Sequence, residues 1–340
     1  MKDLTLQINL SAGDLGYAKM TVPVLVNAHR LHAAEKLAIV DCCRPQKTQV
    51  VDPDRRFPEP EFTRRVAQIC NMAEELKVAG YFDRIVYLYP NDALRDQVSR
   101  KYLRGIIRET HDAGGVTLFG YLAAWEIPTT RYVLHYDADM LLYQECGFDW
   151  AVEAKRLMQK DKRVVSASPR LCPPLKTEQA IQKVKVYSRK NKGRNCIPSE
   201  GGWLNDWFSN RCFLIDRDRL RDCLPLLKGR FLWETILRKF LNRGYPPSSE
   251  MMLFHRLCDV GGWRLVLNTE QAWLLHPLGP DKLRRYLELL PEILHAISEK
   301  HFPEEQRGFE NINLNAWENF LNNGSVQSTQ KVEKAHHEAL

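Results

Sequence analysis

RYVLHYDADMLLY, residues 131–143, combines an apolar, β-rich lead-in with two aspartates one residue apart and a second apolar run. Strand periodicity places Asp137 and Asp139 on the same side of the chain. Two carboxylates buried side by side repel each other and lose hydration. We therefore expect this pair at the exposed carboxyl end of a strand. There, either a cation lies between the carboxylates or the residues form only a polar turn.

On the N-terminal side of this stretch, strands alternate with helices. Apolar alternation and apolar runs predict strands at residues 4–10, 36–43, 83–90 and 130–140. Helical periodicity and capping residues predict helices at residues 21–32, 62–80, 91–111 and 116–126. This alternation predicts an α/β fold with a mostly parallel, Rossmann-like sheet flanked by helices. Ligands of such sheets bind outside the carboxyl ends of the strands, where Asp41, Asp137 and Asp139 fall.

The C-terminal half has a less regular pattern. We predict helices at residues 152–161, 231–244 and 248–263. We predict strands at residues 163–171, 183–190 and 264–277, and a strand and turn at 211–220. Residues 194–210 contain glycines and tryptophans and are expected to be irregular. The second half is therefore mixed, and the polar, charged residues 324–340 are expected to form a flexible tail.

Composition limits the class of protein. The chain has 340 residues, 44% of them hydrophobic, and a net charge of +7, which suits one large domain or two closely joined ones. Nine cysteines without a CxxC pair fit neither a disulfide framework nor a zinc site, and they favour a reducing cytosol. No signal-peptide pattern and no run of about 18 apolar residues is present. We expect a cytoplasmic protein that does not bind nucleic acid, and peripheral contact with a membrane stays open.

The chemistry of the Asp-x-Asp pair suits a divalent cation, because Mg²⁺ and Mn²⁺ take oxygen ligands. In its place after the βα units, the pair resembles the DxD motif of GT-A glycosyltransferases, and of family 2 among them, as does the run at 112–140 that leads to it. The resemblance implies that Asp139 holds Mn²⁺ or Mg²⁺ on the diphosphate of a UDP- or GDP-sugar. It implies that Asp137 faces the ribose or reaches the metal through water, and that Asp41 contacts the base or ribose.

A second motif lies at residues 248–267, SSEMMLFHRLCDVGGWRLVL. In family 2 an acidic residue is followed six residues later by Arg and five residues further by Gly, and Glu250, Arg256 and Gly261 keep both spacings. The resemblance implies that Glu250 is the general base for the acceptor hydroxyl and that Arg256 helps to bind the donor. A helix N-terminus favours the ionised base. The usual Glu-Asp pair is Ser249-Glu250 here, and Glu250 alternatively only complements the helix dipole.

Further candidates surround these motifs. His276, in WLLHPLGP, is a candidate metal ligand, since imidazole binds borderline metals such as Mn²⁺ and several GT-A enzymes use a C-terminal histidine. Trp203, Asp206 and Trp207 lie where family 2 shapes its acceptor site, and the two indoles either stack on a sugar or pack in the core. The basic run at 183–194 is a solvated loop, or it meets the diphosphate, an acidic acceptor or an anionic membrane.

Together these features predict a metal-dependent, inverting glycosyltransferase whose acceptor is a glycan, a glycolipid or a protein. The run KLRRYL after His276 lacks the Gln-x-x-Arg-Trp signature of processive synthases, so we expect transfer of single sugars. The predicted organisation is a nucleotide-sugar-binding half at 1–142, an acceptor-binding and catalytic half of the same domain at 143–290, and a helical extension at 291–323.

Three other functions stay open. A nucleotidyltransferase has a similar sheet, but residues 8–20 offer only Gly13, Gly16 and Lys19 for a phosphate-binding loop. A phosphatase of the haloacid dehalogenase type carries its Asp-x-Asp early in the chain and continues to Thr, whereas this pair lies late and continues to Met140. A third possibility is a GT-A-like domain that binds a nucleotide-sugar or glycan without turnover.

Overall fold

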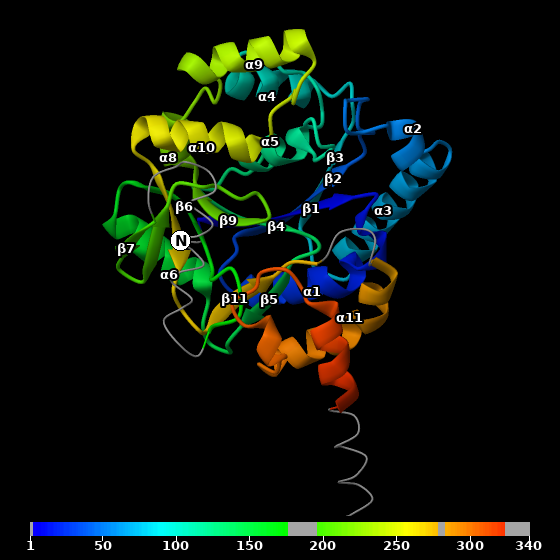
Figure 1. Ribbon diagram of the computed structural model, residues 1–340, viewed down its shortest axis with the longest axis vertical. Helices are drawn as coiled ribbons and strands as arrows, with labels where there is room; N and C mark the ends of the chain where they lie inside the picture. Colours follow the sequence, from blue (N-terminus) through cyan, green and yellow to red (C-terminus); the bar gives the residue numbers. More distant parts are fainter. Residues whose placement is uncertain (1–2, 176–195, 278–282, 324–340) are drawn as a thin grey trace, which may run out of the picture.

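The computed structural model describes residues 3–175, 196–277 and 283–323 (Figure 1). The predicted strand at 183–190, the basic run at 183–194 and the predicted tail lie outside the described residues. Within the described part of the chain, no helix has both the length and the apolar character needed to cross a bilayer.

A nine-stranded sheet forms the centre of the molecule, in the order β3-β2-β1-β4-β9-β6-β10-β8-β7. Its strands are β1 (Leu4–Ser11), β2 (Glu35–Asp41), β3 (Arg84–Leu88), β4 (Tyr132–Asp137), β6 (Val164–Ser168), β7 (Ile197–Ser199), β8 (Gly202–Asn205), β9 (Cys212–Asp216) and β10 (Trp263–Leu267). The first four in this order are parallel. Beyond them, β9 runs antiparallel to β4 and β6, and β10 runs antiparallel to β8. The predicted α/β class with a mixed second half is therefore confirmed.

Helices cover both faces of this sheet (Figure 1). One core lies under α1 (Ala18–His29), α3 (Glu61–Val78), α6 (Trp150–Lys160) and α11 (Leu283–Ser298), together with a small antiparallel sheet of β5 (Leu141–Gln144) and β11 (Ala272–Leu275). The other lies under α4 (Ala93–Leu103), α5 (Leu118–Glu126), α8 (Arg217–Asp222), α9 (Gly229–Leu241) and α10 (Ser249–Val260). A short helix, α2 (Pro53–Arg56), lies in the connection after β2. The sheet is thus buried on both faces, as parallel strands require.

The strand β4 contributes to both cores because its side chains alternate. Tyr132, Leu134 and Tyr136 enter the first core, and Val133 enters the second. Asp137 is the last residue of the strand and has the parity of Val133. The apolar alternation of β4 therefore delivers Asp137 to the carboxyl end of the parallel strands.

Some predicted boundaries are wrong. α4 ends at Leu103 instead of 111, because Arg104 adopts a left-handed conformation with φ of 56° and Gly105 follows it. The predicted strand at 264–277 is two strands, and β5 was not predicted. β5 pairs with β11, which is distant in sequence, so no local signal marks it. The stretch at 194–210 contains β7 and β8 within its loops.

A buried polar network joins α1, β4 and α6 beneath the sheet. The imidazole of His29 lies 3.0 Å from the Asp149 carboxylate and 2.8 Å from the Tyr136 hydroxyl. The indole of Trp150 donates to the same hydroxyl at 2.6 Å. These side chains are buried, so removing one of them costs the network hydrogen bonds that water does not replace.

We predict that His29→Ala lowers the free energy of unfolding by about 3 kcal/mol, because the buried Asp149 carboxylate and the Tyr136 hydroxyl each lose their hydrogen bond to the imidazole and a cavity is left. Urea denaturation of the variant and the wild type measures this difference. His32→Ala is the matched control, since His32 is exposed on the turn after the same helix. Equal losses for the two variants would show that the network does not stabilise the fold.

Candidate functional site

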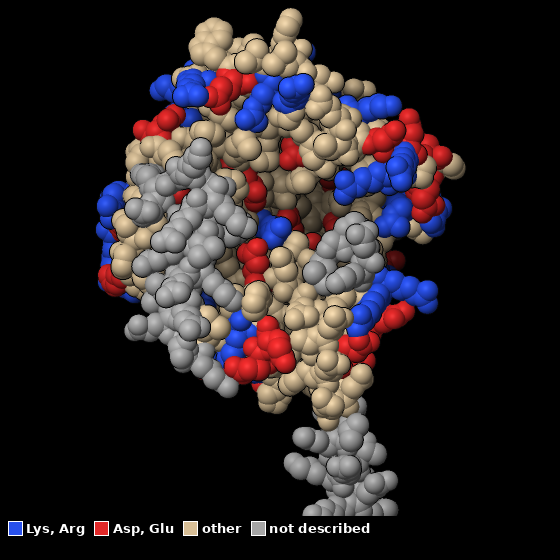
Figure 2. Space-filling view, in the orientation of Figure 1, with Lys and Arg blue, Asp and Glu red and all other residues tan. Residues whose placement is uncertain are grey.

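A cleft of about 310 Å³ opens at the carboxyl ends of β1, β2 and β4. Figure 2 shows the molecule hollowed near the centre of this face, with acidic side chains in the wall. The predicted residues Asp41, Asp137 and Asp139 all line the cleft. The structure therefore brings Asp41 together with Asp137 and Asp139, which lie almost a hundred residues further along the sequence.

The carboxylate of Asp137 is held by hydrogen bonds with Tyr121 and His135. The hydroxyl of Tyr121 contacts its two carboxylate oxygens at 3.0 and 2.8 Å, and Nε2 of His135 lies 3.2 Å from Oδ1. His135 in turn contacts Gln7 through Nδ1, and burial lowers the pKa of this imidazole to about 3. Burial raises the pKa of Asp137 itself, the hydrogen bond from Tyr121 lowers it, and the nearby carboxylate of Glu250 raises it further. The orientation of this carboxylate is fixed before any ligand arrives.

Asp139 lies just beyond the strand and has an unsatisfied oxygen. Its buried Oδ1 atom has no hydrogen-bond partner among the described residues. Burial raises the pKa of Asp139, and the carboxylates of Asp137 and Asp14 raise it further. Asp14 accepts hydrogen bonds from Ser11 and Tyr17, and burial raises its pKa to about 6. Negative charge is therefore concentrated at this end of the sheet, and a cation there would relieve it.

Asp41 forms the wall of the cleft at the end of β2. Its Oδ1 accepts a hydrogen bond from the backbone amide of Cys43 at 2.9 Å. Its Oδ2 is buried without a hydrogen-bond partner in the described chain, and Nε2 of His111 lies 3.6 Å from it. Burial lowers the pKa of His111, so this imidazole is neutral at neutral pH. A polar ligand that donates to Asp41 would satisfy the remaining oxygen.

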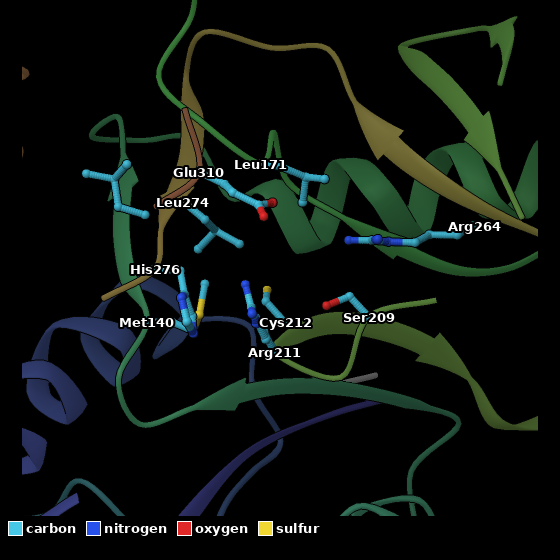
Figure 3. A pocket seen from close by; sticks show the side chains of 10 residues that line it. Met140, Leu171, Ser209, Arg211, Cys212, Arg264, Leu274, His276 and Glu310 are labelled. Atoms are coloured by element: carbon cyan, nitrogen blue, oxygen red, sulfur yellow. The ribbon is translucent and has the colours of Figure 1, made fainter. Parts of the chain in front are cut away.

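A small cavity of about 30 Å³ lies next to Met140, the residue that follows Asp139 (Figure 3). Its wall includes His276, Met140, Arg211 and Arg264, whose guanidinium points toward the cavity. Nε2 of His276 lies 3.8 Å from the nearer oxygen of Asp139. Burial, and then the positive charge of Arg211, lower the pKa of His276 to about 4. A neutral imidazole that faces a carboxylate can bind a metal.

Glu250 lies in the first turn of α10, which begins after the capping hydroxyl of Ser248. Its Oε1 accepts a hydrogen bond of 2.7 Å from the backbone amide of Asn210, and the amide group of Asn210 donates to Ser249. Burial raises the pKa of Glu250, while the Asn210 amide and Arg211 lower it. Burial thus outweighs the helix N-terminus that we expected to keep this carboxylate ionised. Its hydrogen-bond partner Asn210 immediately precedes Arg211, which lines the cavity, and the charge of Glu250 raises the pKa of Asp137.

Five predicted site residues, Glu250 among them, do not line the cleft or the cavity beside it. Arg256 is buried and donates to the Cys223 carbonyl at 2.9 Å and to Asp259 at 2.6 Å. Trp207 packs on Phe254 of α10, with ring centroids 5.3 Å apart. The other two are Trp203, half-buried in β8, and Asp206, buried near the thiol of Cys258. The structure therefore does not bring Arg256 or the predicted acceptor residues to Asp139.

Sequence reasoning missed four residues of the site, namely Asp14, His111, Tyr121 and Arg211. Asp14 follows the end of β1, and His111 lies in the polar connection between α4 and α5. Their position in polar segments after a strand and a helix was the signal in the sequence that could have identified them. Arg211 precedes β9, and its backbone carbonyl accepts a hydrogen bond from the Asp137 amide at 2.9 Å. Its place depends on the antiparallel pairing of β9 with β4, which no local pattern predicts.

The donor atoms present fit a divalent cation in part. Among the described residues, no group of three or more His, Cys, Asp or Glu side chains converges closely enough to hold a metal ion. Asp139 and His276 nevertheless form a facing pair, and Asp139 offers an unsatisfied oxygen. Oδ1 of Asn311 lies 3.3 Å from Nδ1 of His276 and orients the ring, as outer partners of metal ligands do. Two protein ligands suit an ion such as Mg²⁺ or Mn²⁺ that also takes phosphate oxygens and water.

No family model and no curated protein sequence matches the chain. Solved structures similar to it include GalNAc-T7 with UDP, GalNAc and Mn²⁺, at 11% identity and a TM-score of 0.39 over 81% of this chain and 44% of that one. The galactosyltransferase LgtC with donor and acceptor sugar analogs matches at 12% identity and a TM-score of 0.37, over 89% of this chain and 99% of its own.

A third similar structure is the mannosyltransferase PcManGT from Pyrobaculum calidifontis in complex with GDP-Man and Mn²⁺, at 13% identity and a TM-score of 0.37. The match covers 86% of this chain and 62% of the mannosyltransferase chain. Membership of glycosyltransferase family 2 stays a prediction.

The raised pKa values predict a pH-dependent effect of Asp139→Asn in the metal-free protein. In the unfolded chain, aspartates lose their protons near their ordinary pKa of about 4, whereas the folded site holds them to higher pH. The free energy of unfolding of the wild type therefore falls as pH rises from about 4 toward neutrality. Asparagine does not ionise, so the variant should melt a few degrees above the wild type at neutral pH.

This difference should shrink when melting is measured near pH 4, with EDTA present throughout. Asp222→Asn is the control, because Asp222 is exposed and its replacement should change the melting temperature little at either pH. If Asp139→Asn is less stable than the wild type at neutral pH, repulsion between the buried carboxylates does not destabilise the metal-free protein.

Proposed function

We propose that this protein is a metal-dependent glycosyltransferase that moves a sugar from a nucleotide-sugar to an acceptor hydroxyl with inversion. One observation carries the proposal. Asp139 lines a cleft at the carboxyl ends of parallel strands, and its buried Oδ1 has no hydrogen-bond partner in the described chain, while its Oδ2 lies 3.8 Å from Nε2 of the neutral His276. This is where open α/β sheets bind ligands, and its chemistry suits a cation with a diphosphate.

The cleft between β1, β2 and β4 is the proposed donor site. Asp41, with its free oxygen, would accept hydrogen bonds from the base or ribose. Asp137 would face the ribose or a metal-bound water, held in place by Tyr121. Asp139 and His276 would hold Mn²⁺ or Mg²⁺, which supplies charge neutralisation for the leaving diphosphate. The base and the sugar of the donor are not specified by these contacts.

Glu250 is the proposed general base. In this mechanism it accepts the proton of the acceptor hydroxyl, whose oxygen attacks the anomeric carbon from the face opposite the diphosphate. Burial raises the pKa of this carboxyl, which brings it closer to the pH at which a base is effective. Asn210 fixes its orientation through the 2.7 Å hydrogen bond from the backbone.

Arg211 is the cation shared by these groups. Its charge lowers the pKa of Asp137, Asp139 and Glu250, and it lines the cavity with His276. We propose that it balances charge around the diphosphate and the base. Arg256 instead ties α10 to the Cys223 carbonyl, so we assign it a packing role.

The loop after β1 argues against a nucleotidyltransferase. Where such an enzyme would need a basic phosphate-binding loop, Asp14 adds negative charge. Lys19 points to Glu75 instead, with 2.6 Å between their charged atoms, and its side chain is 59% exposed. A sugar transferase in which a cation meets the diphosphate fits this acidic loop better.

We predict that UDP or GDP, or one of their sugars, raises the melting temperature only when Mn²⁺ is present. A ligand at a hundred times its Kd stabilises by about 2.7 kcal/mol through mass action. Asp139→Ala should lose the metal-dependent part of this shift, and Asp222→Ala should keep it. If no nucleotide shifts the melting temperature of the wild type, the donor site is assigned wrongly.

We predict that Glu250→Gln lowers kcat of sugar transfer by about a hundredfold or more, because glutamine cannot accept the hydroxyl proton. Donor binding, followed by the same thermal shift, should be unchanged. Glu299→Gln, at an exposed glutamate of α11's C-terminal side, controls for the substitution itself. Near-normal transfer by Glu250→Gln would remove this residue from the mechanism. Donor binding by a wild type that transfers no sugar to any acceptor class would favour a binding domain.

A further inference from the structure

The helix α9 exposes its apolar side chains to solvent. Trp233 is 69% exposed, Leu237 56%, Phe240 87% and Leu241 51%, and Ile236 is 38% exposed. Their spacing of three and four residues places them on one face of the helix. Most surface helices turn their apolar face toward the core, whereas α9 turns this apolar face toward solvent.

The opposite face of α9 is what attaches the helix to the protein. Phe231 and Thr235 are buried, and the ring of Phe231 stacks on His255 of α10 with centroids 4.1 Å apart. Lys239 donates to the Ile106 carbonyl at 3.0 Å. The helix is therefore held firmly on one side, and its apolar side is an outward ridge rather than an unpacked core element.

Basic residues border this ridge. Of the five basic residues from 228 to 243, Arg238 and Lys239 contact Met251 and the Ile106 carbonyl on the anchoring side. The other three, Lys228, Arg230 and Arg243, are exposed. Glu234 is the single acidic residue of that stretch, and it pairs with Arg230 at 2.7 Å. Figure 2 shows uncharged side chains projecting from the end of the molecule occupied by α9, with Lys and Arg beside them and some acidic side chains among these. The ridge thus combines apolar and cationic character.

The combination of apolar and basic side chains indicates which kind of partner binds this face of α9. Amphipathic helices that lie in a membrane interface place Trp, Phe and Leu in the acyl boundary and Lys or Arg toward anionic headgroups. A second copy of the chain would bring two basic ridges together, and like charges oppose that pairing. A convex ridge at one end of the molecule also suits a flat, deformable surface (Figure 1).

We propose that the outward face of α9 binds the surface of an anionic lipid membrane, with Trp233, Leu237 and Phe240 entering the interface and the bordering basic residues meeting the headgroups. This surface is separate from the cleft at Asp139 and does not depend on the proposed activity. It also differs from the basic run at 183–194, which the sequence suggested for membrane contact.

Vesicle flotation tests this proposal. The probes are vesicles of phosphatidylcholine alone and vesicles of phosphatidylcholine mixed with phosphatidylglycerol. The wild type should float with the anionic vesicles, and less with the neutral ones or at high salt. Trp233→Ser combined with Phe240→Ser should weaken binding to anionic vesicles by about tenfold or more. Arg230→Gln combined with Arg243→Gln should weaken it and reduce its dependence on salt.

Leu31→Ser combined with Val78→Ser is the matched control, because these side chains are 81% and 89% exposed outside α9. It should float as the wild type does, and all variants should share the wild-type melting temperature and nucleotide-induced shift. Three results would overturn the proposal. The wild type fails to float with anionic vesicles, the α9 serine variant floats as the wild type does, or sedimentation shows a dimer that the α9 variant abolishes.

Discussion

The carboxylates of Asp14, Asp137 and Asp139 share one end of the sheet, where burial raises the pKa of all three. Folding thus concentrates negative charge where solvation is poor, and the native state bears that cost. Tyr121 and the amide and hydroxyl of Ser11 offset part of it by donating hydrogen bonds. Oδ1 of Asp139 receives no hydrogen bond from the described chain, so the cost of burying this oxygen is not offset. A ligand that brings positive charge would relieve the repulsion between these carboxylates.

The two halves of the chain divide the work of the proposed site. The parallel strands supply fixed carboxylates, while the C-terminal half of the chain contributes Arg211 before β9, Glu250 at the start of α10 and, from the small two-stranded sheet, His276 after β11. Burial keeps the imidazole neutral and raises the pKa of the glutamate, so both are suited to roles that need an uncharged ligand and a base. The antiparallel pairing of β9 with β4 is what joins these groups.

The helix that carries the proposed membrane ridge packs on the helix that carries Glu250. Phe231 packs α9 against His255 of α10, the same helix whose first turn holds Glu250. The face of α9 that anchors it therefore meets the helix of the base, while its other face meets solvent. A protein seated on a bilayer through this ridge would hold its cleft at a fixed distance from the lipid surface.

The sequence by itself determined the α/β class and the position of Asp41, Asp137 and Asp139 at strand ends, because side-chain periodicity and strand termination are local properties. It also marked Glu250 and His276 as polar residues at a helix start and a strand end. Only the tertiary structure placed Arg211 and Tyr121 beside the aspartates and directed Arg256 and Trp207 away from the cleft. Those outcomes depend on register between strands and helices far apart in sequence, and on burial, neither of which a local pattern encodes.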